Sequence, residues 1–149
     1  LGYMILLGTR SLKTEIMISV LTITYKRHHL LEEAIESFLR QPCTDCEMVI
    51  INDNPEVDYV YEHDRVRIIN CKERFPSIAS KLEWGYKQCK HYYIYRLDDD
   101  DLLAPWALEN VKQDIIDHPG HEIYRSRGMW RFREISLEAI NNFKGRINR

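Results

Sequence analysis

Apolar residues along this chain gather in short continuous runs that alternate with segments of helical spacing. Four runs predict buried strands, because they are rich in β-branched and aromatic residues over strand-like lengths. They cover residues 16–24, 46–53, 66–70 and 92–97. A weaker fifth strand is predicted over residues 122–129. Turn residues such as Asn54 and Pro55 separate the runs, which supports the division into elements.

Helical spacing between these runs predicts helices over residues 30–40, 77–89, 106–117 and 136–144. Ser77 is a candidate N-cap, and Pro42 and Pro119 end two of the helices. The alternation predicts one α/β domain over residues 16–149, a three-layer α/β/α sandwich with a mostly parallel sheet. Residues 1–15 are expected to precede the native domain, as an added or poorly ordered segment, with Met17 as the native start.

Size and charge narrow the classes of protein. A chain of 149 residues suits one hydrophobic core. The formal net charge of −2 gives no overall basic field, so no nucleic-acid partner is expected. The apolar stretch at residues 4–7 is too short to span a bilayer, so no transmembrane segment is expected. We therefore expect a soluble protein in the cytoplasm or another intracellular compartment.

Cysteine and histidine offer two weaker metal hypotheses. Cys43 and Cys46 have CxxC spacing, and Cys71 or Cys89 would have to complete a zinc site. Free thiols in a reducing compartment are the favoured interpretation. His118 and His121 flank a Pro-Gly turn, where surface histidines are favoured over metal ligands.

Polar groups follow three of the predicted strands at the point where each strand ends. They are the stretch 25–27 (Tyr-Lys-Arg), the pair 52–53 (Asn-Asp) and the acidic run 98–101. In open parallel sheets ligands bind beyond the carboxyl ends of the strands, so we expect these groups to meet at one crevice.

Four consecutive aspartates repel one another unless a cation neutralises them. Carboxylate oxygens suit Mn²⁺ or Mg²⁺, and such ions often complete their coordination with substrate phosphates. The alternative is a solvated acidic loop whose negative charge stabilises the N-terminus of the helix that begins near Pro105. The apolar strand before the run favours the metal hypothesis.

Other polar residues are candidates for contacts to a nucleotide. Tyr25 is able to stack on a base, and Asp53 to accept a hydrogen bond from a base or ribose. Arg27 and Lys81 are candidates for phosphate contacts. Each residue also has a plain structural interpretation, as a turn residue, a rim aromatic or a surface charge.

Four segments, taken in order, resemble the GT-A glycosyltransferases of family 2. They are ISVLTITYKR at 18–27, the helix through Gln41, VIINDNP at 49–55 and YIYRLDDDDLLAP at 93–105. The resemblance covers roughly residues 16–125 and implies the GT-A fold, a nucleotide-sugar donor and a DxD metal motif.

Carried over by position, the resemblance assigns roles to individual residues. It implies that Asp98 and Asp100 bind Mn²⁺ or Mg²⁺ and that Asp100 serves catalysis. The nucleotide-sugar-binding residues that it implies are Thr24, Tyr25, Arg27, Asp53, Lys81, Asp98 and Asp99. A truncated acceptor region is expected, and Glu122, Glu134 and Glu138 remain open as candidates for the catalytic base.

The chain departs from the family pattern at several positions. Ile23 replaces a common proline, Lys26 a common asparagine, and Asn52 a frequent aspartate. Lys81 stands where the family often has the arginine of an Arg-Asn pair. These changes bear on base specificity and on the contacts to the diphosphate.

The expected function is metal-dependent transfer of a sugar, from UDP-hexose, to a hydroxyl of a glycan or glycoprotein acceptor. The alternative is a degenerate nucleotide-sugar-binding module or partner subunit. A nucleotidyltransferase or phosphatase is disfavoured, since neither GxxxxGK[ST] nor GxGxxG occurs. A homodimer is expected if the short acceptor region leaves apolar surface exposed.

Overall fold

The computed structural model describes residues 16–121, in which four strands form one sheet in the order β3-β2-β1-β4. The strands are β1 Ile18–Thr24, β2 Glu47–Asn52, β3 Val66–Asn70 and β4 Tyr93–Arg96. Every neighbouring pair is parallel. Thr24 pairs with Asn52 and Asn52 with Asn70, so the carboxyl ends of three strands lie level.

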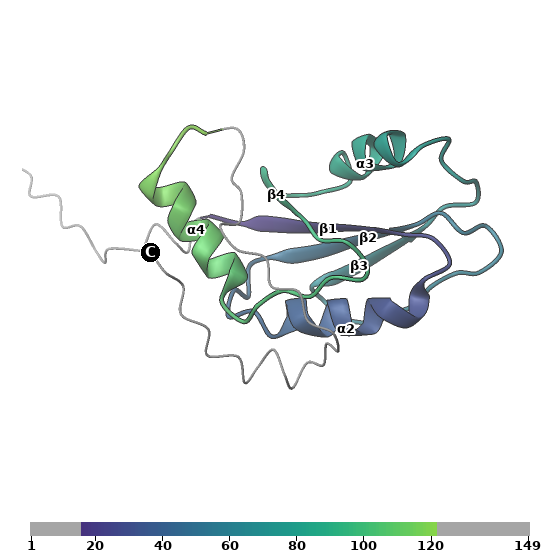
Figure 1. The fold of residues 1–149 in the computed structure, drawn as a ribbon, viewed down its shortest axis with the longest axis horizontal. Helices are drawn as coiled ribbons and strands as arrows, with labels where there is room; N and C mark the ends of the chain where they lie inside the picture. The colour runs from purple at the N-terminus through teal and green to yellow at the C-terminus, as the bar shows by residue number, and fades with distance from the viewer. Residues whose placement is uncertain (1–15, 122–149) are drawn as a thin grey trace, which may run out of the picture.

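Helices cover both faces of this sheet (Figure 1). They are α2 His28–Leu39, α3 Ile78–Tyr86 and α4 Ala107–Asp117. The apolar face of α2 packs on one side, where Leu31 and Phe38 join Val20 and Ile50 in the larger core cluster. Side chains of α3 close the other side, with Leu82 packed against the smaller cluster. The predicted three-layer α/β/α architecture with a parallel sheet is therefore confirmed.

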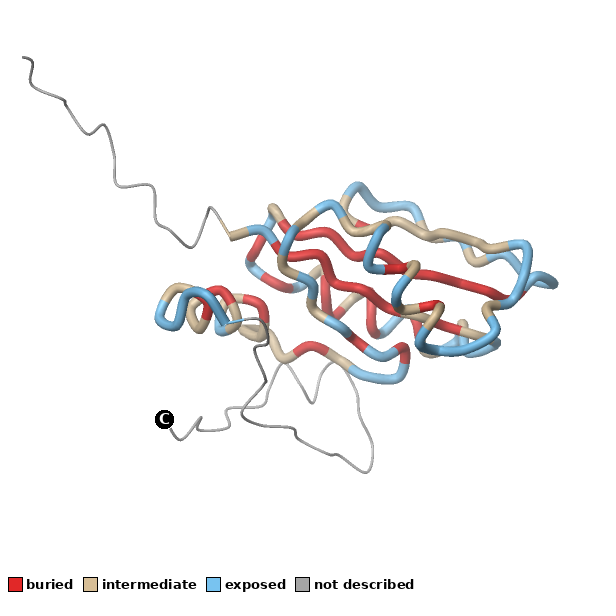
Figure 2. Tube along the Cα trace, turned by 90° about the horizontal axis from the view of Figure 1, so that it is seen from above, coloured by how far each residue is buried: buried red, intermediate tan, exposed pale blue. Residues whose placement is uncertain are grey.

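The central strands β1 and β2 are mostly apolar and are buried at nearly every position, because both faces of the sheet are covered there. Figure 2 shows them as nearly continuous buried segments in the middle of the molecule. On the α3 face, a Cβ added to Gly85 would lie only 3.1 Å from Leu21 Cδ1. The missing side chain thus lets α3 approach β1 closely.

The predicted elements within residues 16–121 all form, with shifted ends. Helix α2 begins at His28 rather than at residue 30, and α3 ends at Tyr86 rather than at residue 89. Ser77 caps α3 as expected, accepting a hydrogen bond from Ser80 N. The strand predicted at 122–129 and the helix at 136–144 lie outside the described residues, as does the segment 1–15. Within the described residues, no helix is long and apolar enough to cross a bilayer.

Candidate functional site

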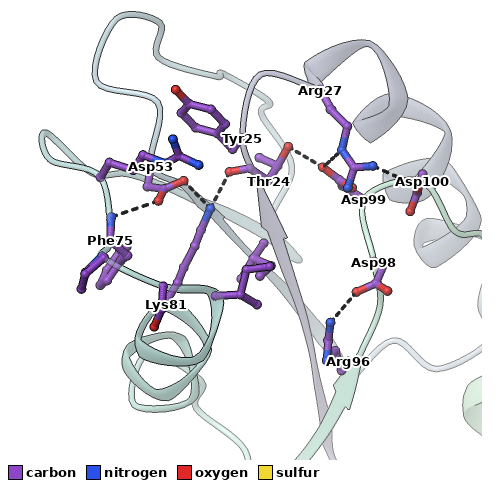
Figure 3. Close-up of a pocket in the computed structure, with 15 residues that line it drawn as sticks. Thr24, Tyr25, Arg27, Asp53, Phe75, Lys81, Arg96, Asp98, Asp99 and Asp100 are labelled. Carbon is purple, nitrogen blue, oxygen red and sulfur yellow. Dashed lines mark hydrogen bonds and ion pairs between the residues drawn. The ribbon is translucent and has the colours of Figure 1, made fainter.

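A cleft of about 920 Å³ opens at the carboxyl ends of the strands (Figure 3). The ends of β1 and β2, the first turn of α3 and the acidic run after β4 line it. The cleft brings together all of the predicted site residues, namely Thr24, Tyr25, Arg27, Asp53, Lys81, Asp98, Asp99 and Asp100. Strand-end placement accounts for this convergence, since all four parallel strands finish at the same edge of the sheet.

Lys81 and Asp53 form a buried pair on the α3 side of the cleft. Lys81 Nζ donates to Asp53 Oδ1 at 2.5 Å and to the carbonyl of Thr24 at 2.6 Å. Asp53 Oδ2 accepts from the backbone N–H of Phe75 at 3.1 Å. Burial lowers the pKa of Lys81, and the hydrogen bond to Asp53 opposes that shift. Lys81 therefore holds Asp53 and the end of β1 in place, rather than presenting a free ammonium to the cleft.

Asp99 lies inside the protein, with only 1% of its side chain exposed. Its Oδ2 accepts hydrogen bonds from Thr24 Oγ1 at 2.8 Å and Arg27 Nε at 3.2 Å. A second guanidinium nitrogen of Arg27 pairs with Asp99 Oδ1. These contacts join the end of β1 to the acidic run. In this arrangement Asp99 positions Arg27 and does not face the cleft as a free carboxylate.

Asp98 and Asp100 flank Asp99, and each side chain is 49% exposed. Asp98 Oδ1 pairs with Arg96 at 3.1 Å, and Asp100 Oδ2 pairs with Arg27 at 3.0 Å. Among the described residues, each of the two carboxylates uses a single oxygen in these pairs. The second carboxylate oxygen of Asp98 and that of Asp100 are therefore two candidate ligands for a hard metal ion at the edge of the cleft.

Within residues 16–121, the four carboxylates of the run outnumber the two guanidinium groups, of Arg27 and Arg96, that pair with it. Burial raises the pKa of Asp101, and the neighbouring carboxylates of Asp100, Asp98 and Asp99 raise it further. A divalent cation would relieve this repulsion, and carboxylate oxygens suit Mn²⁺ or Mg²⁺. Among the described residues, no three of these carboxylates bring oxygens within 4.8 Å of one another. A site of two carboxylates, completed by phosphate oxygens, remains compatible with them.

The opposite wall of the cleft is aromatic and basic. The guanidinium carbon of Arg74 lies 3.9 Å from the centre of the Tyr25 ring. Phe75 follows it and packs against Trp84, with ring centres 5.5 Å apart. The Tyr25 ring thus already stacks with one planar cation, and a flat base has a matching surface there.

The sequence reasoning missed Arg74, Phe75 and Arg96, which also line the cleft. A signal for them was present. Arg74 and Phe75 come soon after β3, and Arg96 ends β4, so all three are strand-end residues.

Asn52 stands where the family often has an aspartate, and the structure shows what its amide does. Its Nδ2 donates to Val57 O at 2.9 Å and to Asn70 Oδ1 at 2.8 Å. Its Oδ1 accepts from the backbone N–H of Asn54 at 3.1 Å. Two of these contacts need a donor, which a carboxylate lacks. Asn52 therefore braces the loop after β2.

Known proteins share this architecture. S. aureus TarS in complex with UDP superposes with a TM-score of 0.57 at 17% identity, covering 69% of this chain and 33% of that one. The mannosyltransferase PcManGT from Pyrobaculum calidifontis, in complex with GDP-Man and Mn²⁺, gives 0.51 at 16% identity, covering 66% and 31%. At these identities the likeness establishes the fold.

Sequence comparison establishes the family. A chondroitin synthase from Escherichia coli is 31% identical over 106 residues, covering 66% of this chain. The chain spans only 15 to 38% of the length of the curated relatives that are at least 30% identical to it. Residues 19–147, most of the chain, match the family described as Glycosyl transferase family 2, and the chain therefore belongs to that family.

Proposed function

We propose that this chain binds a nucleoside diphosphate sugar, UDP-hexose, together with Mn²⁺ or Mg²⁺, and takes part in transfer of the sugar to an acceptor hydroxyl. One observation carries the proposal. A single cleft has a stacking aromatic ring on one wall and two half-exposed carboxylates on the other. A nucleotide base and a metal-bound diphosphate need those two surfaces.

On the base side, the ring of Tyr25 stacks on the base, and Asp53 accepts a hydrogen bond from the base or ribose. Asp53 keeps its orientation through Lys81 and Phe75 N. Arg74 either remains over the ring or moves aside as the base enters. This arrangement makes Lys81 a positioning residue rather than the direct phosphate ligand expected from the sequence.

On the diphosphate side, Asp98 and Asp100 would hold the cation, which would stabilise negative charge on the departing diphosphate. Asp99 fixes the guanidinium of Arg27 beside them. Arg27 and Arg96, which pair with Asp100 and Asp98, would supply guanidinium donors to the phosphate oxygens. The complexes of TarS with UDP and of PcManGT with GDP-Man and Mn²⁺ support this choice of ligand.

A second candidate is a donor-binding module without transferase activity. Among the described residues, the carboxylates that line the cleft are Asp53, Asp98, Asp99 and Asp100, and each pairs with a lysine or arginine. None is therefore placed as a free general base for the acceptor hydroxyl. The base candidates Glu122, Glu134 and Glu138 lie outside the described residues.

A thermal-shift panel tests the proposal. UDP-glucose, UDP-GlcNAc, GDP-mannose and UMP are each added with and without Mn²⁺, and the melting temperature is measured. Ligands that bind only the folded state raise it. We expect a shift with UDP-sugars that requires Mn²⁺ and is lost in Asp100→Asn. No shift with any nucleotide in the presence of Mn²⁺ would refute the proposal.

Product analysis then separates transferase from binding module. Released UDP and glycosylated product are measured across glycan and glycoprotein acceptors. Transfer identifies the enzyme, whereas metal-dependent binding with neither transfer nor hydrolysis identifies the module. Homodimerisation remains a prediction, which the mass in solution would test.

A further inference from the structure

The loop between α2 and β2 places two thiols and a carboxylate together, far from the cleft. The sulfurs of Cys43 and Cys46 and a carboxylate oxygen of Asp45 all lie within 4.8 Å of one another. Both cysteines are buried, with 4% and 2% exposed. The loop precedes β2, whereas the cleft lies beyond the opposite end of that strand.

A buried lysine from α4 completes this cluster. The side chain of Lys112 is 2% exposed, and its Nζ lies 3.0 Å from Asp45 Oδ1. A buried ammonium beside a thiol favours the thiolate. The hydrogen bond from Cys43 and the charge of Lys112 lower the pKa of Cys46, against burial and the Asp45 charge. The same hydrogen bond between the two thiols raises the pKa of Cys43.

We propose that Cys43 and Cys46 form a reversible dithiol–disulfide pair, oxidised by exchange with a small-molecule disulfide such as oxidised glutathione. Two residues separate the cysteines and their sulfurs already approach one another, so side-chain rotation and a small loop movement bring them to bonding distance. Cys46 is the attacking thiol, because it adjoins Asp45, the partner of the buried Lys112 ammonium, and the charge of that ammonium lowers the pKa of Cys46.

The exchange balances without a further reactant. The Cys46 thiolate attacks one sulfur of the small disulfide, which forms a mixed disulfide and releases one thiolate. Cys43 then loses its proton and attacks the Cys46 sulfur, which forms the Cys43–Cys46 bond and releases the second thiolate. Two protein thiols are oxidised, and the small disulfide is reduced to two thiols.

A zinc ion is the competing occupant of this cluster. The part of the chain that the structure describes supplies three ligand atoms here, whereas structural zinc sites take four. The carboxylate of Asp45 is already paired with the Lys112 ammonium, which a cation would have to displace or tolerate. These two features favour the dithiol pair over the metal site.

The experiment equilibrates the whole chain in glutathione buffers of varied ratio, then quenches it with acid and alkylates the free thiols. Trypsin cuts after Arg40 and Arg65, which leaves Cys43 and Cys46 in one peptide. A disulfide lowers the mass of that peptide by about 2 Da and blocks both alkylations. Because both sulfurs are buried, exchange is slow, so populations are measured at equilibrium.

We expect the two thiols to disappear together as the buffer becomes oxidising, while the Cys71→Ser control behaves like the original chain. Neither Cys43→Ser nor Cys46→Ser should show the mass decrease of about 2 Da, because each variant lacks one of the two thiols that form the disulfide. Lys112→Met should slow alkylation of Cys46 at neutral pH by roughly tenfold for each unit by which its pKa rises. It should also favour the disulfide at a given glutathione ratio, because the reduced form loses a stabilising charge.

Either of two results would overturn the proposal. One is a peptide that stays reduced, or that carries only separate glutathione adducts, at every ratio. The other is a purified chain that holds one zinc ion per molecule, measured by elemental analysis, and whose thiols resist oxidation until a chelator removes it. Both readouts are independent of nucleotide binding and of transfer.

Discussion

The ammonium of Lys81 lies 2.5 Å from the carboxylate of Asp53, and the two side chains are only 6% and 4% exposed. This pair joins the first turn of α3 to the end of β2, and Lys81 also reaches the last carbonyl of β1. Three elements thus meet on one ammonium group. The orientation of Asp53 in the cleft therefore depends on the first turn of α3 as well as on the backbone N–H of Phe75.

Lys81→Met should therefore lower the free energy of unfolding by about 3–5 kcal/mol, because it leaves the buried Asp53 carboxylate unpaired. Adding Asp53→Asn should recover much of that loss, since the amide carries no charge and still accepts from Phe75 N. Urea unfolding of both single variants and the double variant measures the coupling. Additive losses would show that the pair does not act as a unit.

Substitutions of Asp99 and of Asp100 should have different effects, the first mainly on stability and the second mainly on metal binding. Asp99→Ala leaves the Thr24 hydroxyl and part of Arg27 without their acceptor, so we expect a loss of about 2–3 kcal/mol in unfolding free energy. Asp100→Asn removes only a half-exposed pair and should cost less than about 1 kcal/mol.

The loss of affinity for UDP and Mn²⁺ should be larger in Asp100→Asn than in Asp99→Ala, the reverse of the order expected for the loss of stability. Calorimetry with UDP and Mn²⁺ should show a severe loss of affinity in Asp100→Asn, while folded Asp99→Ala retains metal-dependent binding. Equal stability losses in the two variants would contradict the assignment of Asp99 as the buried partner of Arg27. Retained metal-dependent affinity in Asp100→Asn would contradict the metal role.

The architecture was predictable from the sequence because the two central strands are buried on both faces and so appear as short runs rich in apolar and β-branched residues. The cleft followed from strand ends alone. The orientation of each side chain in the cleft could not be predicted in this way. Asp99 turns inward because Thr24 and Arg27, more than 70 residues earlier, offer it donors. Sequence spacing carries no sign of that contact, or of the burial of Lys81.

The start of α2 shows the same limit. The polar stretch at residues 25–29 predicts that the helix begins at residue 30. The structure begins it at His28, with Arg27 as an N-cap that makes no side-chain capping bond. The Arg27 side chain pairs with Asp99 and Asp100 instead, contacts that sequence spacing does not reveal.

Lys26 offers a test of backbone strain. It has φ of 58°, a left-handed conformation that glycine and asparagine adopt more easily than lysine. Lys26→Gly should raise the unfolding free energy by about 0.5–1 kcal/mol. The ion pair with Glu56 is exposed at 51% and 70%, so losing it costs little. The matched control Lys26→Ala removes the same ion pair but keeps the strain, and it should give no gain.

Asp101 gives a prediction with a defined sign in pH. Its pKa is raised in the folded chain, so ionisation costs stability; the cost is absent below the unfolded pKa of about 3.9 and complete above the folded pKa. Asp101→Asn should therefore raise the melting temperature at pH of about 7 and have a much smaller effect near pH 4. Glu62→Gln, which removes another exposed carboxylate, is the control.

Mn²⁺ should diminish the difference between Asp101→Asn and the original chain at neutral pH. A cation held by Asp98 and Asp100 offsets the carboxylate repulsion that raises the pKa of Asp101, so the substitution then has less repulsion to relieve. The melting temperatures of both chains are compared with and without Mn²⁺ at constant ionic strength. A difference that Mn²⁺ leaves unchanged would show that no cation binds close to the run, whereas an effect equal in Glu62→Gln would indicate general screening.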